Sequence, residues 1–223
     1  MTALRNTGCA LALYLLLAPL GTWAAPHMPP EILRLEQQWA AIKYELPKQQ
    51  RQEALKQLLA EAEGVVAAKP GKAEALIWQA IIMHNYAAEK RGMGALKMVK
   101  HCRDMLEKAE QIDPLALDGL AYVTLGMLHY KVPPWPIGFG DDEKAEEYLR
   151  KGLEISPRGL DANYFMGDFL LRQKRFGEAV EHLKKATHAP PRPEWPLADA
   201  GRKADAERLL AKTRSQMQKR PEP

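Results

Sequence analysis

Cysteine is scarce in this chain, which has only Cys9 and Cys102. Cys9 lies in an N-terminal segment that we expect to be removed, so a single thiol would remain and no intramolecular disulfide could form. A scaffold held together by disulfides is therefore excluded. A lone thiol in an exported chain is usually buried, and we expect Cys102 to be an inert core residue.

Aromatic residues are also few, at 7%, and β-branched residues are sparse, whereas Ala, Leu, Glu, Lys, Arg and Gln dominate. This balance favours helices over strands and predicts an all-α fold. The apolar share of 46% and the charged share of 27% are ordinary for a soluble globular protein. A chain of 223 residues can form one domain with a substantial core.

Motifs for catalysis and metal binding are missing as well. The chain has no HExxH, CxxC, GxSxG or Walker pattern, and its six histidines are scattered. We therefore expect no enzyme, no cofactor and no metal site. The net charge of +4 is too small to indicate a nucleic-acid partner.

Only one long apolar run occurs, at residues 11–20, and it is too short to span a bilayer as a helix. Arg5 precedes the run, and Thr22-Trp23-Ala24 follows it with small residues suited to a cleavage site. Residues 1–24 therefore resemble a cleaved secretory signal, which predicts a periplasmic protein. The alternative is a retained N-terminal anchor, but Cys9 precedes the apolar run and is not placed for lipid attachment. We do not expect membrane anchoring after cleavage.

Four prolines that would each end a helix indicate an internal repeat: Pro70, Pro114, Pro157 and Pro191. Their spacings are 44, 43 and 34 residues, and the last equals the tetratricopeptide period. We therefore predict a tetratricopeptide-like solenoid of helical hairpins, with about nine helices and no strand. The single domain, 25–223, would contain repeats at about 30–70, 73–114, 119–157 and 160–193 and a C-terminal capping helix at 198–218.

Small residues recur where the two helices of each repeat would cross, for example Gly167 with Ala179 and Gly126 with Ala145. Two repeats are longer than the template. The 73–114 repeat is expected to have a turn ten residues longer than usual, and the 119–157 repeat has seven extra residues within KVPPWPIGFGDD, residues 131–142.

On these residues the chain resembles a tetratricopeptide repeat protein. More narrowly it resembles the TatT family, the T component associated with some TRAP (tripartite ATP-independent periplasmic) transporters. The resemblance lies within residues 110–212, in the segments DPLALDGLAYVTLG, YKVPPWPIGFGDDEKAEEYLRKGLEISP, ANYFMGDFLL and APPRPEWPLADAGRKADAERLLAK. It implies a helical periplasmic protein with a cleft or pore for an apolar ligand, and a periplasmic solute-binding protein as partner. Members can be lipoproteins, whereas this chain has no lipobox.

The groove of a tetratricopeptide solenoid is lined mainly by positions 2, 5, 9, 12 and 13 of the first helix in each repeat. Grooves that grip a terminal carboxylate use Lys and Asn at positions 5 and 9, which this chain lacks, so a carboxylate clamp is disfavoured. The lining is apolar in two repeats and polar in the last. The candidate binding residues are Ile77, Ile81, His84, Val123, Met127, Tyr130, Trp135, Phe139, Tyr164, Asp168 and Arg172.

An apolar groove would be costly to leave in water, since ~300 Å² of apolar area represents roughly 7 kcal/mol. The candidates for covering it are the N-terminal helix, the 131–142 loop, a small apolar ligand and a protein partner. In the loop, three prolines stiffen the chain, and Gly138 and Gly140 permit turns with positive φ. Trp135, Ile137 and Phe139 are expected to point inward over the groove.

Charged residues have expected roles in the helix that follows the loop and in the C-terminal helix. Asp141 and Asp142 are expected to cap the helix that follows the loop. The C-terminal helix is expected to lie on the last repeat through Leu209 and Leu210, with its charges facing water.

Two functions remain open. The first is a periplasmic scaffold for protein–protein interaction. The second is a TatT-like accessory component of a TRAP transporter that binds an apolar or amphipathic solute in the groove.

Overall fold

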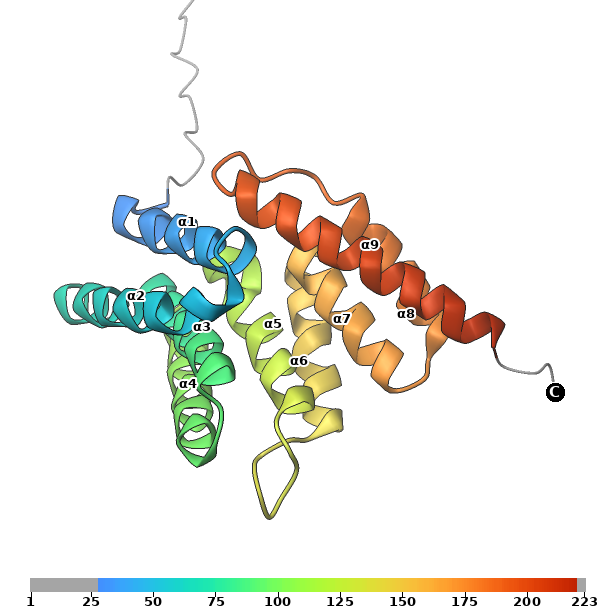
Figure 1. Ribbon diagram of the computed structural model, residues 1–223, viewed down its shortest axis with the longest axis horizontal. Coiled ribbons are helices and arrows are strands. Elements are labelled where there is room, and N and C mark those ends of the chain that lie inside the picture. Colours follow the sequence, from blue (N-terminus) through green and yellow to red (C-terminus); the bar gives the residue numbers. More distant parts are fainter. Residues whose placement is uncertain (1–27, 220–223) are drawn as a thin grey trace, which may run out of the picture.

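The computed structural model describes residues 28–219, which form nine α-helices and no strand (Figure 1). The predicted signal segment, 1–24, lies outside the described residues. The helices are α1 (Pro30–Tyr44), α2 (Lys48–Ala68), α3 (Ala73–Lys90), α4 (Met93–Ile112), α5 (Ala116–Lys131), α6 (Asp142–Ile155), α7 (Leu160–Arg172), α8 (Phe176–Thr187) and α9 (Pro196–Gln218).

Consecutive helices pack as hairpins, most extensively α3 with α4, α5 with α6 and α7 with α8. Each hairpin packs in turn on the next one along the chain. The predicted all-α solenoid with a C-terminal capping helix is therefore confirmed.

Small residues allow the two helices of a hairpin to approach closely. A Cβ atom on Gly126 of α5 would lie 2.6 Å from Leu149 Cγ of α6, and one on Gly167 of α7 would lie 2.6 Å from Leu183 Cγ of α8. Side chains of normal size would not fit at these crossings. The expectation that small residues mark the crossings is therefore correct at Gly126 and Gly167.

The prediction of a long turn between the two helices of the 73–114 repeat is wrong. Only Arg91 and Gly92 separate α3 from α4, and both have positive φ, 57° and 78°. Because the extra residues are good helix formers, they lengthen the two helices and leave the turn short.

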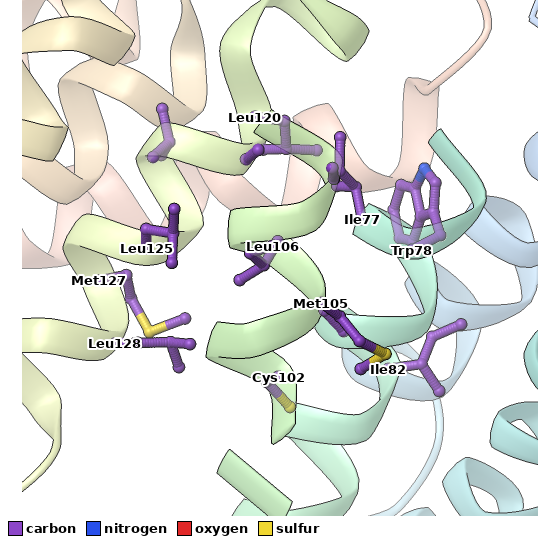
Figure 2. Close-up of a cluster of buried hydrophobic side chains, with 14 of the residues drawn as sticks. Ile77, Trp78, Ile82, Cys102, Met105, Leu106, Leu120, Leu125, Met127 and Leu128 are labelled. Atoms are coloured by element: carbon purple, nitrogen blue, oxygen red, sulfur yellow. The ribbon is translucent and has the colours of Figure 1, made fainter. Parts of the chain in front are cut away.

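The interior between α3, α4 and α5 is filled by aliphatic side chains, methionines and Cys102 (Figure 2). Cys102 is fully buried, and its burial raises the pKa of its thiol to about 12. The thiol is therefore neutral at physiological pH and is a core residue, as expected.

Helix α9 does more than cap the last repeat. It packs on α8 and α7, and it also contacts α1 at the other end of the chain (Figure 1). Since α1, α3, α5 and α7 pack in succession, the contact of α9 with α1 completes a ring of five helices. None of the described helices combines the length and apolar character that crossing a bilayer requires.

Candidate functional site

A cavity of about 260 Å³ lies inside this ring, with lining residues from α1, α3, α5, α7 and α9 and from the segment that precedes α9. It is slightly smaller than typical small-molecule sites, which span roughly 300–1,000 Å³. We call it the central cavity.

One wall of the central cavity is aromatic. Trp39 and Tyr44 come from α1, Trp78 comes from α3, and Trp195 lies directly before α9. Trp78 makes edge-to-face contacts with Trp39 at 5.5 Å and with Trp195 at 5.6 Å between ring centroids. Such contacts stabilise the fold beyond the burial of the rings themselves, and they connect α1 through α3 to the segment before α9.

The lining from α5, α7 and α9 combines apolar and charged groups. Met127 comes from α5, and Tyr164 and Phe165 come from α7. The guanidinium of Arg202 from α9 lies over both α7 rings, 4.7 Å from the centroid of Tyr164 and 4.8 Å from that of Phe165. These cation–π contacts hold the arginine against the ring faces.

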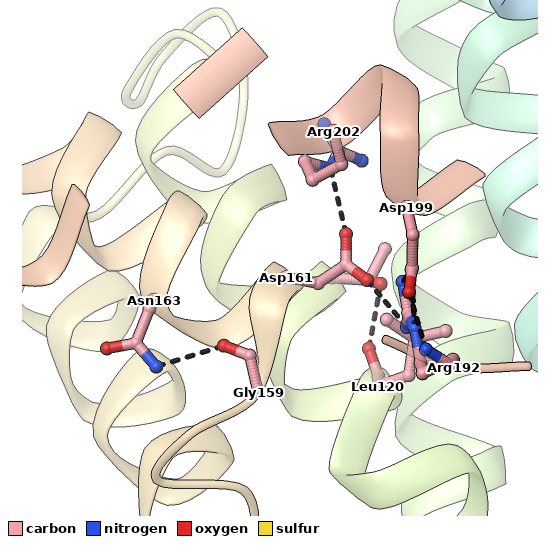
Figure 3. A network of polar contacts seen from close by, with 8 residues as sticks. Leu120, Gly159, Asp161, Asn163, Arg192, Asp199 and Arg202 are labelled. Atoms are coloured by element: carbon pink, nitrogen blue, oxygen red, sulfur yellow. Dashed lines mark hydrogen bonds and ion pairs between the residues drawn. The ribbon is translucent and has the colours of Figure 1, made fainter. Parts of the chain in front are cut away.

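An ion-pair network connects α7 to α9 beside the cavity (Figure 3). Asp161 accepts hydrogen bonds from Arg202 Nε at 2.8 Å and from Arg192 Nη1 at 3.0 Å. Arg192 also donates to Asp199 through its backbone N–H, Nε and Nη2. Burial alone would raise the pKa of Asp161, but Arg192 and Arg202 outweigh it and hold that pKa at about 2.

Arg202 is only 7% exposed. The expectation that the charges of the C-terminal helix face water is therefore wrong for this residue. The cause is Asp161, since a buried carboxylate requires a cationic partner.

Among the described lysine and arginine residues that line the cavity, Lys43 is the one without a carboxylate partner. Within residues 28–219, no carboxylate lies within 4 Å of its Nζ, which instead lies 4.7 Å from the ring centroid of Trp39 and 5.1 Å from that of Tyr44. Burial, followed by the charge of Arg202, lowers the pKa of Lys43 well below its usual value. By contrast, Lys131 is paired with Asp168 at 3.4 Å.

Three residues that line the cavity also carry a buried ring nitrogen without a hydrogen-bond partner in the described chain: Trp39 Nε1, Trp78 Nε1 and His84 Nδ1. Burial lowers the pKa of His84 to about 4, so its imidazole is neutral at physiological pH. Unpaired buried nitrogens are uncommon in folded proteins, and each one requires an explanation.

The family model "Tetratricopeptide repeat" matches residues 137–158, which include α6, and residues 160–192, which include α7 and α8. The two matched segments are therefore similar to tetratricopeptide repeats. The matched repeats supply α7, with Asp161, Tyr164 and Phe165, and Arg192 to the central cavity.

Among solved structures, the crystal structure of a thermophilic tetratricopeptide repeat protein in Thermus thermophilus is similar to this chain, with 19% identity and a TM-score of 0.41. The similarity covers 79% of this chain and 97% of the other. No curated protein matches the sequence.

The binding residues predicted from the repeat positions lie in different environments. Those that line the central cavity are Ile81, His84, Met127 and Tyr164. Ile77 and Val123 are buried in the core between helices, and Val123 meets Gly152 of α6.

Three further predicted residues form a polar cluster between α5 and α7. Tyr130 donates its hydroxyl to Asp168 Oδ2 at 2.9 Å, and Asp168 pairs with Arg172 at 3.6 Å. Burial raises the pKa of Tyr130 well above its usual value, so its hydroxyl remains a donor to the carboxylate.

The α5–α6 loop, residues 132–141, does not cover the groove. Trp135 is 85% exposed and Ile137 is 66% exposed, so the expectation that they point inward is wrong. Phe139 is partly buried, but it does not line the central cavity. Its ring centroid lies 5.3 Å from that of His129 and 4.8 Å from the guanidinium carbon of Arg103. The apolar lining is instead covered by α1 and the start of α9.

The backbone of the loop is tied down. Gly140 N–H donates to Pro133 O at 2.9 Å, and Asp141 N–H donates to His129 O at 3.0 Å. Gly138 and Gly140 do not adopt the positive φ that glycine permits. Their role is close approach, since added Cβ atoms would lie 2.4 Å from Pro133 O and 2.0 Å from Val132 O.

The expected helix cap after the loop is confirmed at Asp141, whose Oδ1 accepts from Lys144 N–H at 3.0 Å. This cap ends the loop at a fixed point, the start of α6.

Sequence reasoning missed Lys43, Tyr44, Trp78 and Trp195 at the cavity. The first helix pair matches the repeat template weakly, so groove positions were not assigned on α1. One signal was present: Trp39 and Lys43 are four residues apart in a predicted helix and therefore share a face.

Proposed function

We propose that the protein is a non-catalytic interaction scaffold of the periplasm, and that its α5–α6 loop is the contact for a protein partner. The observation that carries this proposal is the 85% exposure of Trp135, beside the exposed Ile137, on a loop whose backbone is held by internal hydrogen bonds. Tetratricopeptide repeats are a fold used for protein interaction, which supports the general role.

The exposed Trp135 and Ile137 lie on a loop that is already ordered. Large apolar side chains in water are normally scattered singly, and Trp is enriched among residues that dominate binding energy. A loop that already has a fixed shape loses little conformational entropy when a partner binds it. Trp135 and Ile137 therefore present a preorganised apolar contact.

Site-specific photo-crosslinking tests this proposal. Benzoylphenylalanine is placed at Trp135, at Ile137 and, as a matched control, at the exposed Glu61 of α2. We expect a partner adduct at the first two positions, identified by mass spectrometry, and we expect the purified partner to bind the native protein and not the Trp135→Ala variant. Adducts no stronger at 135 and 137 than at 61 would contradict the proposal.

The location is supported by the N-terminal segment alone. Cell fractionation and the mass of the exported chain test it, and we expect a mature protein that begins at Ala25. A chain that keeps residues 1–24 in the cytoplasm would refute this part.

A second candidate function is an accessory role in TRAP-type transport, with a periplasmic solute-binding protein as the partner. The central cavity favours it, because a scaffold that acts only through its surface has no need of a cavity with a charged lining. Purification of the tagged protein from cells that express such a transporter tests it. We expect the solute-binding protein to copurify, and its absence would leave the scaffold role alone.

A further inference from the structure

One of the basic side chains that line the central cavity has no carboxylate partner. Arg202 and Arg192 are both paired with Asp161, and Lys131 is paired with Asp168. Among the described lysine and arginine residues of the cavity, only Lys43 has no carboxylate within 4 Å.

The carboxylates that favour the charged form of Lys43 are Asp205 and Asp161, and other groups already hold both. Asp205 pairs with Arg208 and accepts from the Tyr44 hydroxyl at 3.5 Å. Asp161 could not move to Lys43 without weakening its pairs with Arg192 and Arg202, and Asp205 also lies 3.7 Å from Arg202. A lysine in such a position releases its proton readily unless an anion lies beside it, so an anion from outside the chain would stabilise its ammonium form.

The other lining residues and the volume of the cavity limit the chemical character and size of the ligand. The lining includes Trp78, Trp195, Met127, Tyr164 and Phe165, so the cavity is bounded largely by rings and a thioether. The volume of about 260 Å³ admits a small molecule and excludes a folded segment of protein.

We propose that the central cavity binds a small organic carboxylate with an apolar or aromatic body, and that Lys43 is its counter-ion. The carboxylate lies at Lys43, and the body lies between the tryptophans of α1 and α3 and the rings of α7. This site is separate from the α5–α6 loop. It does not depend on the scaffold role and would specify the solute class of the second candidate function.

Calorimetric titration of the purified protein tests the proposal with two acids and their neutral isosteres: phenylacetate against phenylacetamide, and hexanoate against hexanamide. We expect saturable one-to-one binding of at least one acid, with its amide bound about ten-fold or more weakly, because hydrogen bonds to charged groups are the stronger ones. The Lys43→Met variant keeps the length of the side chain and is expected to lose a similar factor. The matched control is Lys48→Met, at an exposed lysine that begins α2, and it is expected to bind as the native protein does.

Three results would overturn the proposal: no saturable heat with either acid, equal affinity for acid and amide, or unchanged acid binding in Lys43→Met. Thermal unfolding of Lys43→Met checks that it is folded. If it is not, the comparison of acid with amide on the native protein still decides the question. A failed crosslink at Trp135 would leave these outcomes unaffected, so the scaffold and the cavity proposals fail separately.

Discussion

Arg202 donates Nε–H to Asp161 Oδ1 at 2.8 Å, which joins α9 to α7 in a nearly buried ion pair. Asp161 also accepts from Arg192, so one carboxylate satisfies two guanidinium groups. A pair of this kind adds little stability over an apolar pair of the same shape, but removal of one member leaves an uncompensated buried charge.

We therefore expect Asp161→Asn to lower the free energy of unfolding by about 3 kcal/mol. The matched control is Asp104→Asn, which removes an exposed partner of Arg103 and should cost less than about 1 kcal/mol. Urea denaturation of the two variants measures both values. Equal losses would mean that the buried pair is not important for the closure of the fold.

The contact between α1 and α9 depends on Gly201. A Cβ atom at this position would lie 2.4 Å from Cδ1 of Tyr44, and that ring is held by an edge contact with Trp39. Gly201→Ala should therefore destabilise the protein by about 1–3 kcal/mol. Gly177→Ala in α8, where nothing lies within 4 Å, should be neutral or stabilising by up to about 1 kcal/mol. Thermal unfolding compares the two, and a Gly201→Ala variant as stable as Gly177→Ala would show that the helices separate at no cost.

The helices of this fold follow from local chemistry. Prolines such as Pro114 and Pro157 end helices wherever they occur, and small residues such as Gly167 mark crossings, so both can be recognised in the sequence. Closure by α9 could not be predicted, because Tyr44 and Gly201 are distant in sequence and nothing local to either one specifies the other. The same holds for Arg202, whose burial depends on a carboxylate in another helix.

The α5–α6 loop illustrates a second limit. Its prolines and glycines predict a stiff, compact loop, and the backbone contacts of Gly138 and Gly140 bear this out. Its apolar side chains led to the prediction that they point inward, which is wrong for Trp135 and Ile137. Hydrophobic content alone does not distinguish a residue that covers the protein's own surface from one that binds a partner. Stiffness is a local property, whereas direction depends on how the loop joins α5 and α6.

Trp135 and Trp78 should differ sharply in their contribution to stability. Trp78 is 2% exposed and contacts two other tryptophans, so Trp78→Ala should cost about 3–5 kcal/mol. Trp135→Ala removes a side chain in water and should change the free energy of unfolding by no more than about 0.5 kcal/mol. Chemical denaturation of the two variants tests this. A large loss for Trp135→Ala would restore the interpretation of the loop as a cover over the protein's own apolar surface.

Glu36 of α1 should make stability depend on pH. Its side chain is 1% exposed, its Oε1 has no hydrogen-bond partner in the described chain, and burial raises its pKa from 4.5 to about 7 despite the charge of Arg192. Between those two pKa values the folded protein keeps a proton that the unfolded chain releases. The stability contributed by the neutral carboxyl is therefore present in full at low pH and is lost as the pH rises towards 7.

We expect Glu36→Gln to stabilise the protein relative to the native chain by on the order of 2 kcal/mol more at pH 8 than at pH 5. The difference between the two proteins must be used, because His84, whose pKa is lowered to about 4, shifts the stability of both in the opposite direction over part of this range. Urea denaturation at the two pH values gives that difference, with the exposed Glu61→Gln as the matched control. If Glu36→Gln shows the same pH dependence as Glu61→Gln, then Glu36 is ionised in the folded protein at both pH values, and Arg192 must stabilise its charge more strongly than burial opposes it.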